Sequence, residues 1–382
     1  MRTFFWFVTI LLFFVSPLSC GGSTSQKVVK IGAIVPLTGP AAAPGNEMNN
    51  AVILAAEEWN SADKMGGYKI VVDSKDDASD PKQAVSAAHA LMSDPLVFGV
   101  VAHLNSGCFL PASKIYHSTG VVAISGATTN PQITLQGFPE IFRICSTDLV
   151  QGEITGRCIR DLGYSRVAVI HDKTQYGMGL AEVVRDTAAK LGLQVVSFDG
   201  IDVGEKDFRA LLTKIKDQRP DVVYFGGMYD EAGLIVAQMR ALQMDQQFIS
   251  DDGVFGQDFI DAGGAETEGA IISMVGAPLT ELSQADDFMR KYEQRFGTKI
   301  QNYGPYAYDV ANILLSALAR VIERNGRPDK ALLLEEVRKT EHDGVIGRTS
   351  FDEKGDTRNQ LITLYRVTEG KFVPFKTMSL NE

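Results

Sequence analysis

Cysteine is scarce in this chain, which has only four cysteines among 382 residues. Cys20 belongs to the N-terminal leader described below, so only Cys108, Cys145 and Cys158 remain for the body of the chain. At most one internal disulfide can form among them, which excludes a small disulfide-stabilised fold. Two interpretations stay open: a bridge between Cys145 and Cys158, the nearer pair in sequence, or three buried free thiols.

The sequence also lacks the common catalytic signatures. It contains no G-x-S-x-G elbow, Walker loop, H-E-x-x-H pair or C-x-x-C pair. Gly177 and Gly179 resemble the start of a dinucleotide-binding turn, but Glu182 stands where that turn needs its third glycine. The five histidines show no spacing typical of metal ligands. We therefore expect no enzyme, no cofactor and no metal site.

Positive charge is in deficit, because 37 Lys and Arg stand against 47 Asp and Glu, for a formal net charge of −10. This balance argues against a nucleic-acid ligand. The hydrophobic fraction of 45% and the charged fraction of 22% are ordinary for a globular protein. The chain is longer than one typical core, so we expect two lobes.

Long hydrophobic runs are also few, and the only one occupies residues 4–15. It is too short to span a bilayer comfortably and ends near small residues, so we predict an export signal over residues 1–19. Leu and Ser before Cys20 resemble the lipobox of bacterial lipoproteins, although Pro17 departs from that pattern. We expect export to the periplasm or cell envelope, with Cys20 as a lipid anchor and residues 20–27 as a tether.

From residue 28 onward, short β-branched runs alternate with longer amphipathic stretches. This spacing predicts an α/β fold of parallel sheets with helices on both faces, in two cycles that divide near Arg143. We predict helices over 48–62, 81–93, 111–119, 150–162, 180–191, 208–218, 232–242, 284–296, 306–325 and 330–340, before a β-rich end. Pro81 and Pro111 are expected in the first turns of their helices.

Polar residues follow the ends of predicted strands, the place where open α/β sheets bind ligands. The loops concerned are 103–107, 125–131, 171–177, 226–229 and 251–253. Loops that converge on one crevice in this way can hold one small ligand.

Several motifs occur in an order that is far more specific than any one of them: IGAIVPLTGP, DDASDPKQAV, HLNSG with PAS, ISGATTNP, HDKTQYGMGLA, GEKDF, VVYFGG and FDEKGD. By these motifs the chain resembles the leucine/isoleucine/valine-binding protein family of ABC importers along nearly its whole mature length. The resemblance implies a periplasmic binding protein type I fold, with two doubly wound parallel-sheet lobes joined by a three-crossing hinge. Lobe 1 would comprise residues 28–146 and 276–355, and lobe 2 residues 147–275 and 356–382.

The same resemblance assigns a cradle for the α-carboxylate of an amino acid. The hydroxyl groups of Ser106 and Thr129 would donate hydrogen bonds to it. Backbone N–H groups near Asn105 and from Ala127 through Thr128 to Thr129 would complete the cradle. Charge-assisted hydrogen bonds of this kind contribute roughly 1.5 to 3 kcal/mol each.

Other contacts would come from the second half of the chain. Asp252 would pair with the α-ammonium, although better-studied members carry the longer Glu there, so the lobes would close further or a water would bridge the gap. Tyr176 would cover the ligand on closure. Pro44 and Met228 replace large aromatic residues that contact the ligand side chain in the family, and Tyr229 is a candidate to supply the missing ring.

The resemblance implies a non-enzymatic, monomeric receptor that captures a small amino acid, branched-chain or otherwise aliphatic, for the permease and ATPase subunits of an ABC importer. Its contact with the membrane would be limited to the lipid anchor. The alternatives are a binding protein for an amide or small aromatic acid, a sensor ectodomain, and a secreted hydrolase. A hydrolase would use Ser106 or Cys108 as nucleophile with His103 or His171 as base.

Overall fold

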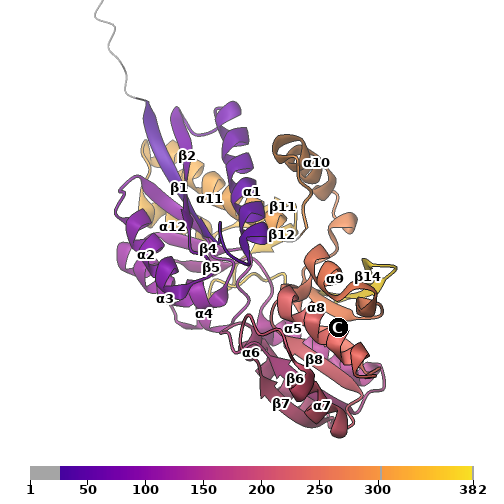
Figure 1. Ribbon diagram of the computed structural model, residues 1–382. Coiled ribbons are helices and arrows are strands. Elements are labelled where there is room, and N and C mark those ends of the chain that lie inside the picture. Colours follow the sequence, from indigo (N-terminus) through magenta and orange to yellow (C-terminus); the bar gives the residue numbers. More distant parts are fainter. Residues whose placement is uncertain (1–25, 302, 381–382) are drawn as a thin grey trace, which may run out of the picture.

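The computed structural model describes residues 26–301 and 303–380 (Figure 1). It contains two separate sheets of mainly parallel strands, each covered by helices, and a small hairpin. The predicted export signal, Cys20 and most of the predicted tether lie outside the described residues.

The first lobe is built on a five-stranded parallel sheet with the order β2-β1-β3-β4-β5. Its strands are β1 (Lys27–Val35), β2 (Tyr68–Asp76), β3 (Val97–Ala102), β4 (Val122–Ser125) and β5 (Ile141–Arg143). Its helices are α1 (Ala42–Ser61), α2 (Pro81–Met92), α3 (Ser106–Thr119), α4 (Gln132–Leu135), α10 (Ala285–Phe296), α11 (Gly304–Asn325) and α12 (Lys330–Arg338). Helices α2 and α3 pack on one face of the sheet, and α1 and α11 pack on the other. The hairpin of β11 (Glu341–Gly344) and β12 (Gly347–Ser350) follows α12.

Two glycines let helices approach this sheet closely. A Cβ at Gly32 of β1 would lie 2.2 Å from Leu91 of α2. A Cβ at Gly99 of β3 would lie 2.8 Å from Leu314 of α11. A larger residue at either position would force the buried leucine to shift, so these glycines allow the close packing of the helices on the two faces.

The second lobe is built on a seven-stranded sheet with the order β14-β13-β10-β9-β8-β6-β7. Its strands are β6 (Arg166–His171), β7 (Gln194–Gly200), β8 (Val222–Gly226), β9 (Gln247–Ser250), β10 (Ile271–Val275), β13 (Ile362–Thr368) and β14 (Lys371–Met378). Its helices are α5 (Asp148–Asp161), α6 (Gly177–Lys190), α7 (Arg209–Asp217), α8 (Tyr229–Ala241) and α9 (Gln257–Gly263). Short 3₁₀ turns are η1 (Asp252–Val254), η2 (Gly264–Thr267) and η3 (Leu279–Glu281). Strand β13 runs antiparallel to both of its neighbours.

The strand orders of the two lobes correspond: 2-1-3-4-5 in the first matches 7-6-8-9-10 in the second. Helices α5 and α6 cover one face of the second sheet, and α7, α8 and α9 cover the other. Strands β4, β8 and β10 are buried along their whole length, as expected for parallel strands covered on both faces. The predicted α/β class with two doubly wound sheets is confirmed.

The chain passes between the sheets three times: from β5 to α5, from β10 to α10, and from β12 to β13. The boundaries expected at 146/147, 275/276 and 355/356 each fall within one of these connections. Which lobe each connecting segment moves with stays a prediction.

Helix α3 corrects one expectation, because it begins at Ser106 and not at Pro111. The carbonyl of Asn105 accepts the N–H groups of Cys108 at 3.0 Å and Phe109 at 3.1 Å, which starts the helix before the proline. Cys108 and Phe109 are fully buried, so packing stabilises this first turn. Pro111 therefore lies in the second turn, where its missing N–H leaves the carbonyl of Gly107 without the usual helical partner.

The three described cysteines are free and buried, which decides the disulfide question in favour of separate thiols. Burial raises the pKa of the Cys158 thiol to about 11 and raises the pKa of the other two further. Such thiols act as small apolar groups in the core.

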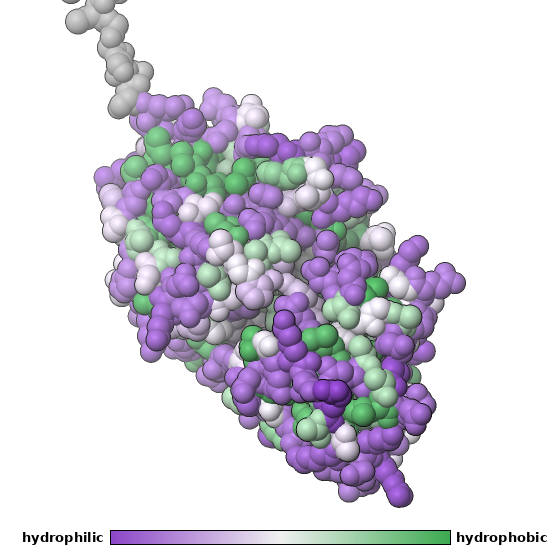
Figure 2. Space-filling view, viewed as in Figure 1, coloured by the Kyte–Doolittle hydropathy of each residue, from purple (hydrophilic) through white to green (hydrophobic). Residues whose placement is uncertain are grey.

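None of the helices in residues 26–301 and 303–380 is long and apolar enough to cross a membrane. On the face shown in Figure 2, hydrophilic residues cover most of the surface and apolar residues form smaller groups between them.

Candidate functional site

The candidate site lies between the lobes, at the carboxyl ends of strands from both sheets. Asn105 and Ser106 follow β3, and Ala127 follows β4. From the second lobe, Tyr176 precedes α6, and Asp252 follows β9. The doubly wound topology brings these loops together because their parallel strands end at the same edge of each sheet.

These loops enclose a small cavity of about 30 Å³. The residues that line it are Leu104, Asn105, Ser106, Ala127, Tyr176, Met228, Asp252, Gly253 and Tyr303. Six of them are predicted ligand residues, and they come from both halves of the chain. A volume of this size holds about one water molecule, so the lobes must part before an amino acid can enter.

Asp252 is the central acidic group of the cavity and is only 2% exposed. One carboxylate oxygen accepts the hydroxyl of Tyr176 at 2.8 Å, and the other accepts the hydroxyl of Tyr303. The backbone N–H of Gly253 donates to the Tyr176 oxygen at 2.9 Å. Burial raises the pKa of Asp252, and the two tyrosine hydrogen bonds act against that rise.

Two further buried carboxyl groups lie near Asp252. Asp251 accepts the hydroxyl of Tyr224 at 3.2 Å and the N–H of Gly227 at 3.3 Å. Burial raises the pKa of Asp148 to about 7, and the charge of Asp252 adds to that rise. Within the described residues, none of these three carboxyl groups forms a salt bridge. Burial raises the pKa of all three, so a ligand cation would stabilise the ionised form that burial disfavours.

The opposite wall of the cavity offers hydrogen-bond donors. Ser106 begins α3, whose first N–H groups form a positive helix terminus. Ser106 is 2% exposed, and its hydroxyl oxygen accepts the N–H of Asn130 at 3.4 Å. No acceptor for its hydrogen is found among the described residues, so the hydroxyl can donate to an anionic group. This wall suits a carboxylate, whereas the Asp252 wall suits an ammonium.

The loop after β4 is folded by Ser125. Its Oγ accepts the N–H groups of Ala127 at 3.2 Å and Thr128 at 2.9 Å, and the hydroxyl of Thr128 at 2.6 Å. These donors of Thr128 are thus already used inside the loop. Thr129 is fully buried, and neither threonine lines the cavity in this arrangement. Contact between Thr129 and a ligand stays a prediction.

A buried arginine holds the same loop from behind. Arg143 is 0% exposed and donates to the carbonyls of Thr128 at 3.2 Å and Asn130 at 2.7 Å. Its guanidinium also pairs with Asp356 at 2.5 Å. Since Arg143 ends β5 and Asp356 precedes β13, this pair joins two of the three crossings to the backbone around Thr129.

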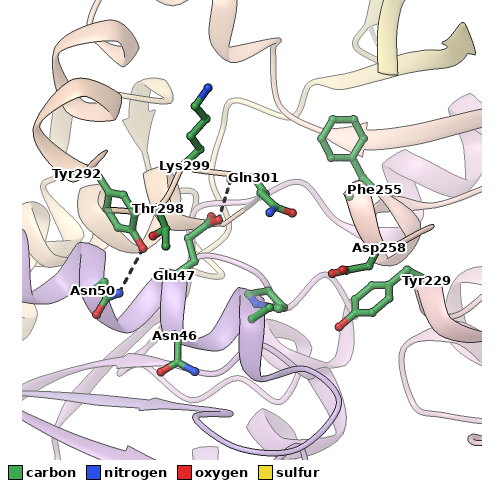
Figure 3. A pocket seen from close by; sticks show the side chains of 13 residues that line it. Asn46, Glu47, Asn50, Tyr229, Phe255, Asp258, Tyr292, Thr298, Lys299 and Gln301 are labelled. Carbon is green, nitrogen blue, oxygen red and sulfur yellow. Dashed lines mark hydrogen bonds between the residues drawn. The ribbon is translucent and has the colours of Figure 1, made fainter. Parts of the chain in front are cut away.

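Pro44 and Tyr229 lie in a neighbouring cavity of about 280 Å³ (Figure 3). In Figure 3, Tyr229 and Asp258 face Glu47 of α1 from the opposite side. The Tyr229 hydroxyl donates to the carbonyl of Pro40 at 2.8 Å, so it bonds across the lobes. Neither Pro44 nor Tyr229 lines the central cavity, while Met228 does.

Tyr303 is a cavity residue that the sequence did not point to. It is the N-cap of α11 and lies 51 residues from Asp252, on the other lobe. A helix start at 306 placed Tyr303 in a loop, although Pro305 was a signal that the helix begins earlier. The contact between Tyr303 and Asp252 depends on how the two lobes pack together. The local sequence around Tyr303 carries no information about that packing.

The arrangement expected for a hydrolase does not form among the described residues. Both ring nitrogens of His103 are engaged, Nδ1 with Asp77 at 2.6 Å and Nε2 with the Tyr116 hydroxyl at 2.8 Å. His171 Nδ1 accepts the N–H of Lys173 at 3.1 Å. Neither histidine is hydrogen-bonded to Ser106 or Cys108, so no nucleophile–base pair is present there. The described residues also contain no cluster of His, Cys, Asp and Glu suited to a metal ion.

Comparison with known families decides the assignment of the chain. The family model for periplasmic binding proteins matches residues 28–371. The chain belongs to that family. This periplasmic binding protein is 36% identical to the Leu/Ile/Val-binding protein homolog 1 of Brucella suis over 354 residues, 92% of this chain and 94% of the relative. It is also 33% identical to the leucine-, isoleucine-, valine-, threonine- and alanine-binding protein of Pseudomonas aeruginosa over 344 residues, 90% and 91% of the two chains.

Solved structures agree with this assignment. The leucine-binding protein of Thermotoga maritima superposes with a TM-score of 0.85 at 28% identity, covering 92% of this chain and 99% of that one. A branched-chain amino acid transporter substrate-binding protein of Streptococcus pneumoniae, in complex with isoleucine, gives 0.84 at 26% identity, covering 92% and 100%. The expected family and type I fold are confirmed. Membership implies an exported, periplasmic substrate-binding protein.

Proposed function

We propose that this periplasmic binding protein captures a small amino acid, branched-chain or otherwise aliphatic, between its lobes and delivers it to an ABC importer. The observation that carries the proposal is the presence in one cavity of the buried Asp252 carboxyl group, which has no cationic partner among the described residues, and the donor wall at Ser106. Those two groups complement the ammonium and the carboxylate of an α-amino acid. The names of the relatives, a Leu/Ile/Val-binding protein homolog and a leucine-, isoleucine-, valine-, threonine- and alanine-binding protein, support the same ligand class.

In this proposal the ligand replaces contacts that the lobes now make with each other. The α-ammonium would take the place of the Tyr303 hydroxyl at Asp252. The α-carboxylate would accept the Ser106 hydroxyl and N–H groups at the start of α3. The N–H of Ala127 would join them by giving up its present bond to Ser125 Oγ. An aliphatic side chain would then pack on Met228, whose flexible thioether adapts to different shapes.

Ligand identification tests the proposal directly. The protein purified from its native host should release an amino acid on denaturation, identified by mass spectrometry. Calorimetry with the twenty amino acids should then show tightest binding for an aliphatic one. Release of an amide or an aromatic acid instead, with no affinity for any amino acid, would contradict the proposal. Recovery of that ligand in chemically altered form after incubation would favour an enzyme.

Closure of the lobes gives a second prediction. The lobes now meet through the Tyr229 bond to Pro40 and through a bond of 2.9 Å from the Asn130 amide to the carbonyl of Gln175. Because the central cavity is too small to admit an amino acid, we propose that the free protein is mainly in an open form with the lobes apart. A saturating ligand is therefore expected to reduce the radius of gyration in small-angle X-ray scattering. An unchanged radius would contradict closure on the ligand.

The N-terminal anchor gives a third prediction. We propose that Cys20 is lipidated and that residues 20–27 tether the lobes to the membrane, near the permease and ATPase subunits. The variant Cys20→Ser should then lose membrane association in cell fractionation, while its soluble form keeps ligand affinity in calorimetry. Intact mass measurement of the wild-type protein from its native host provides the control. A mature protein without added lipid mass would disprove the anchor.

A further inference from the structure

A second cavity of about 710 Å³ adjoins the central one between the lobes. Asn105 and Met228 line both cavities, so the two are neighbours across these side chains. The first lobe contributes Ser79, in the turn before α2, and the second contributes Asp172, which follows β6. We call this cavity the side groove.

Three buried acceptor atoms of the side groove lack a hydrogen-bond partner among the described residues: Ser79 Oγ, Asn105 Oδ1 and Asp172 Oδ2. Asp172 is 2% exposed, and its other oxygen accepts the N–H of Thr174 at 2.9 Å and the Thr174 hydroxyl at 2.7 Å. An acceptor left unpaired in this way costs free energy that a ligand donor would recover. The unpaired atoms come from both lobes, so a ligand donor in this cavity has candidate acceptors on either side.

The charge of the side groove favours a cation. Its described lining includes the carboxyl groups of Asp172, Glu205, Asp230 and Glu231 against the single ammonium of Lys206. Burial raises the pKa of Asp172 to about 6, so this carboxyl is still mostly ionised at neutral pH. A cation beside it would stabilise the ionised form.

The wall between the two cavities is apolar. Met228 stands at the junction, and Tyr229, Leu234 and Val203 continue the lining of the side groove. An alkyl stem passing Met228 would thus stay in contact with apolar surface before its end reached Asp172. The two cavities share only Asn105 and Met228, so a side chain that extends from the central cavity into the side groove would pass these two residues.

We propose that the side groove binds the cationic end of a long, unbranched amino-acid side chain, so that the protein takes basic amino acids in addition to aliphatic ones. The proposal rests on the proposed function, since the α-ammonium and α-carboxylate of the same ligand would occupy the central cavity. Asp172, Ser79 and Asn105 would accept hydrogen bonds from the terminal ammonium or guanidinium. The alkyl stem would pack on Met228.

Calorimetry with four ligands tests this inference. Lysine and norleucine share an unbranched stem, and only lysine carries the terminal charge; arginine and leucine complete the set. Lysine or arginine is expected to bind about tenfold or more tightly than norleucine, the effect of a charge-assisted hydrogen bond. Asp172→Asn should remove that difference while leaving leucine affinity within about twofold. The control Asp217→Asn removes an exposed carboxylate of α7 outside the groove. It should change neither the preference for basic ligands over norleucine nor the affinity for leucine.

The outcomes separate this inference from the proposed function. If leucine binds but neither basic amino acid exceeds norleucine, or if Asp172→Asn keeps the preference, the side groove is not a cation subsite and the proposed function stands. If no amino acid binds, the proposed function fails and the inference falls with it. Should Asp172→Asn not fold by circular dichroism, Glu205→Lys provides the same test from the exposed rim of the groove. Glu205→Lys should lower the affinity for lysine and arginine alone. An equal loss of leucine affinity would overturn the inference.

Discussion

Asp252→Asn is expected to weaken the binding of an α-amino acid by about two to four decades in calorimetry. The substitution keeps the shape of the side chain and one acceptor but removes the negative charge. A ligand ammonium would then be enclosed without a counter-charge, because the described residues place no other ionic partner within the cavity lining. A ligand without the amino group, such as 4-methylpentanoate, should lose far less affinity.

Asp251→Asn is the matched control for this experiment. Asp251 is a neighbouring carboxyl group and is fully buried, but it does not line the cavity. Its replacement should therefore change affinity much less than Asp252→Asn does. If Asp252→Asn binds an amino acid within about threefold of the wild type, the ammonium partner is another group or the ligand is not an amino acid. A small aromatic or aliphatic acid held at Ser106 would then become the better hypothesis.

Arg143→Met is expected to lower the free energy of unfolding by about 3 to 5 kcal/mol in urea denaturation. The substitution leaves the carboxylate of Asp356 without its cation and the carbonyls of Thr128 and Asn130 without their donor. The same change should weaken ligand binding, since these carbonyls flank Thr129 in the predicted carboxylate cradle. Methionine fills a similar volume, so a large cavity is not the cause of the loss.

Two further variants are the controls for Arg143→Met. Arg320→Met breaks an ion pair with Glu336 from a half-exposed arginine and should cost less than about 1 kcal/mol. The double variant Arg143→Met with Asp356→Leu removes both partners and should recover part of the stability lost by the single variant. If Arg143→Met costs no more than Arg320→Met, the buried pair does not stabilise the hinge in the way we describe.

Much of the fold could be predicted because its signals are local. The β-branched runs of β6, β8 and β10 and the amphipathic stretches between them indicate parallel sheets without reference to distant residues. The predicted start of α3 was wrong because Pro111 is a strong local signal for a first helical turn. The burial of Phe109, which favours an earlier start, is a tertiary effect that the local sequence does not show.

Less of the site could be predicted from the sequence, because several of its contacts are tertiary. Ser106 and Asp252 follow strand ends, so their neighbourhood could be predicted from topology, and the structure places both on one cavity. Tyr303 contacts Asp252 across the lobe boundary, and Arg143 meets Asp356 at a separation of 213 residues. Periodicity carries no information about such contacts. The roles of the individual ligand residues stay predictions until the variants are measured.

The position of β13 has a consequence for how an exported chain acquires its structure. This strand lies between β10 and β14, so the sheet of the second lobe is completed only by residues near the C-terminus. During passage across a membrane those residues emerge last, and until then the edge of β10 has no partner. Translocated intermediates would thus expose an open edge that invites aggregation or proteolysis. Export of β13 and β14 is therefore the step that closes this edge of the sheet in the second lobe.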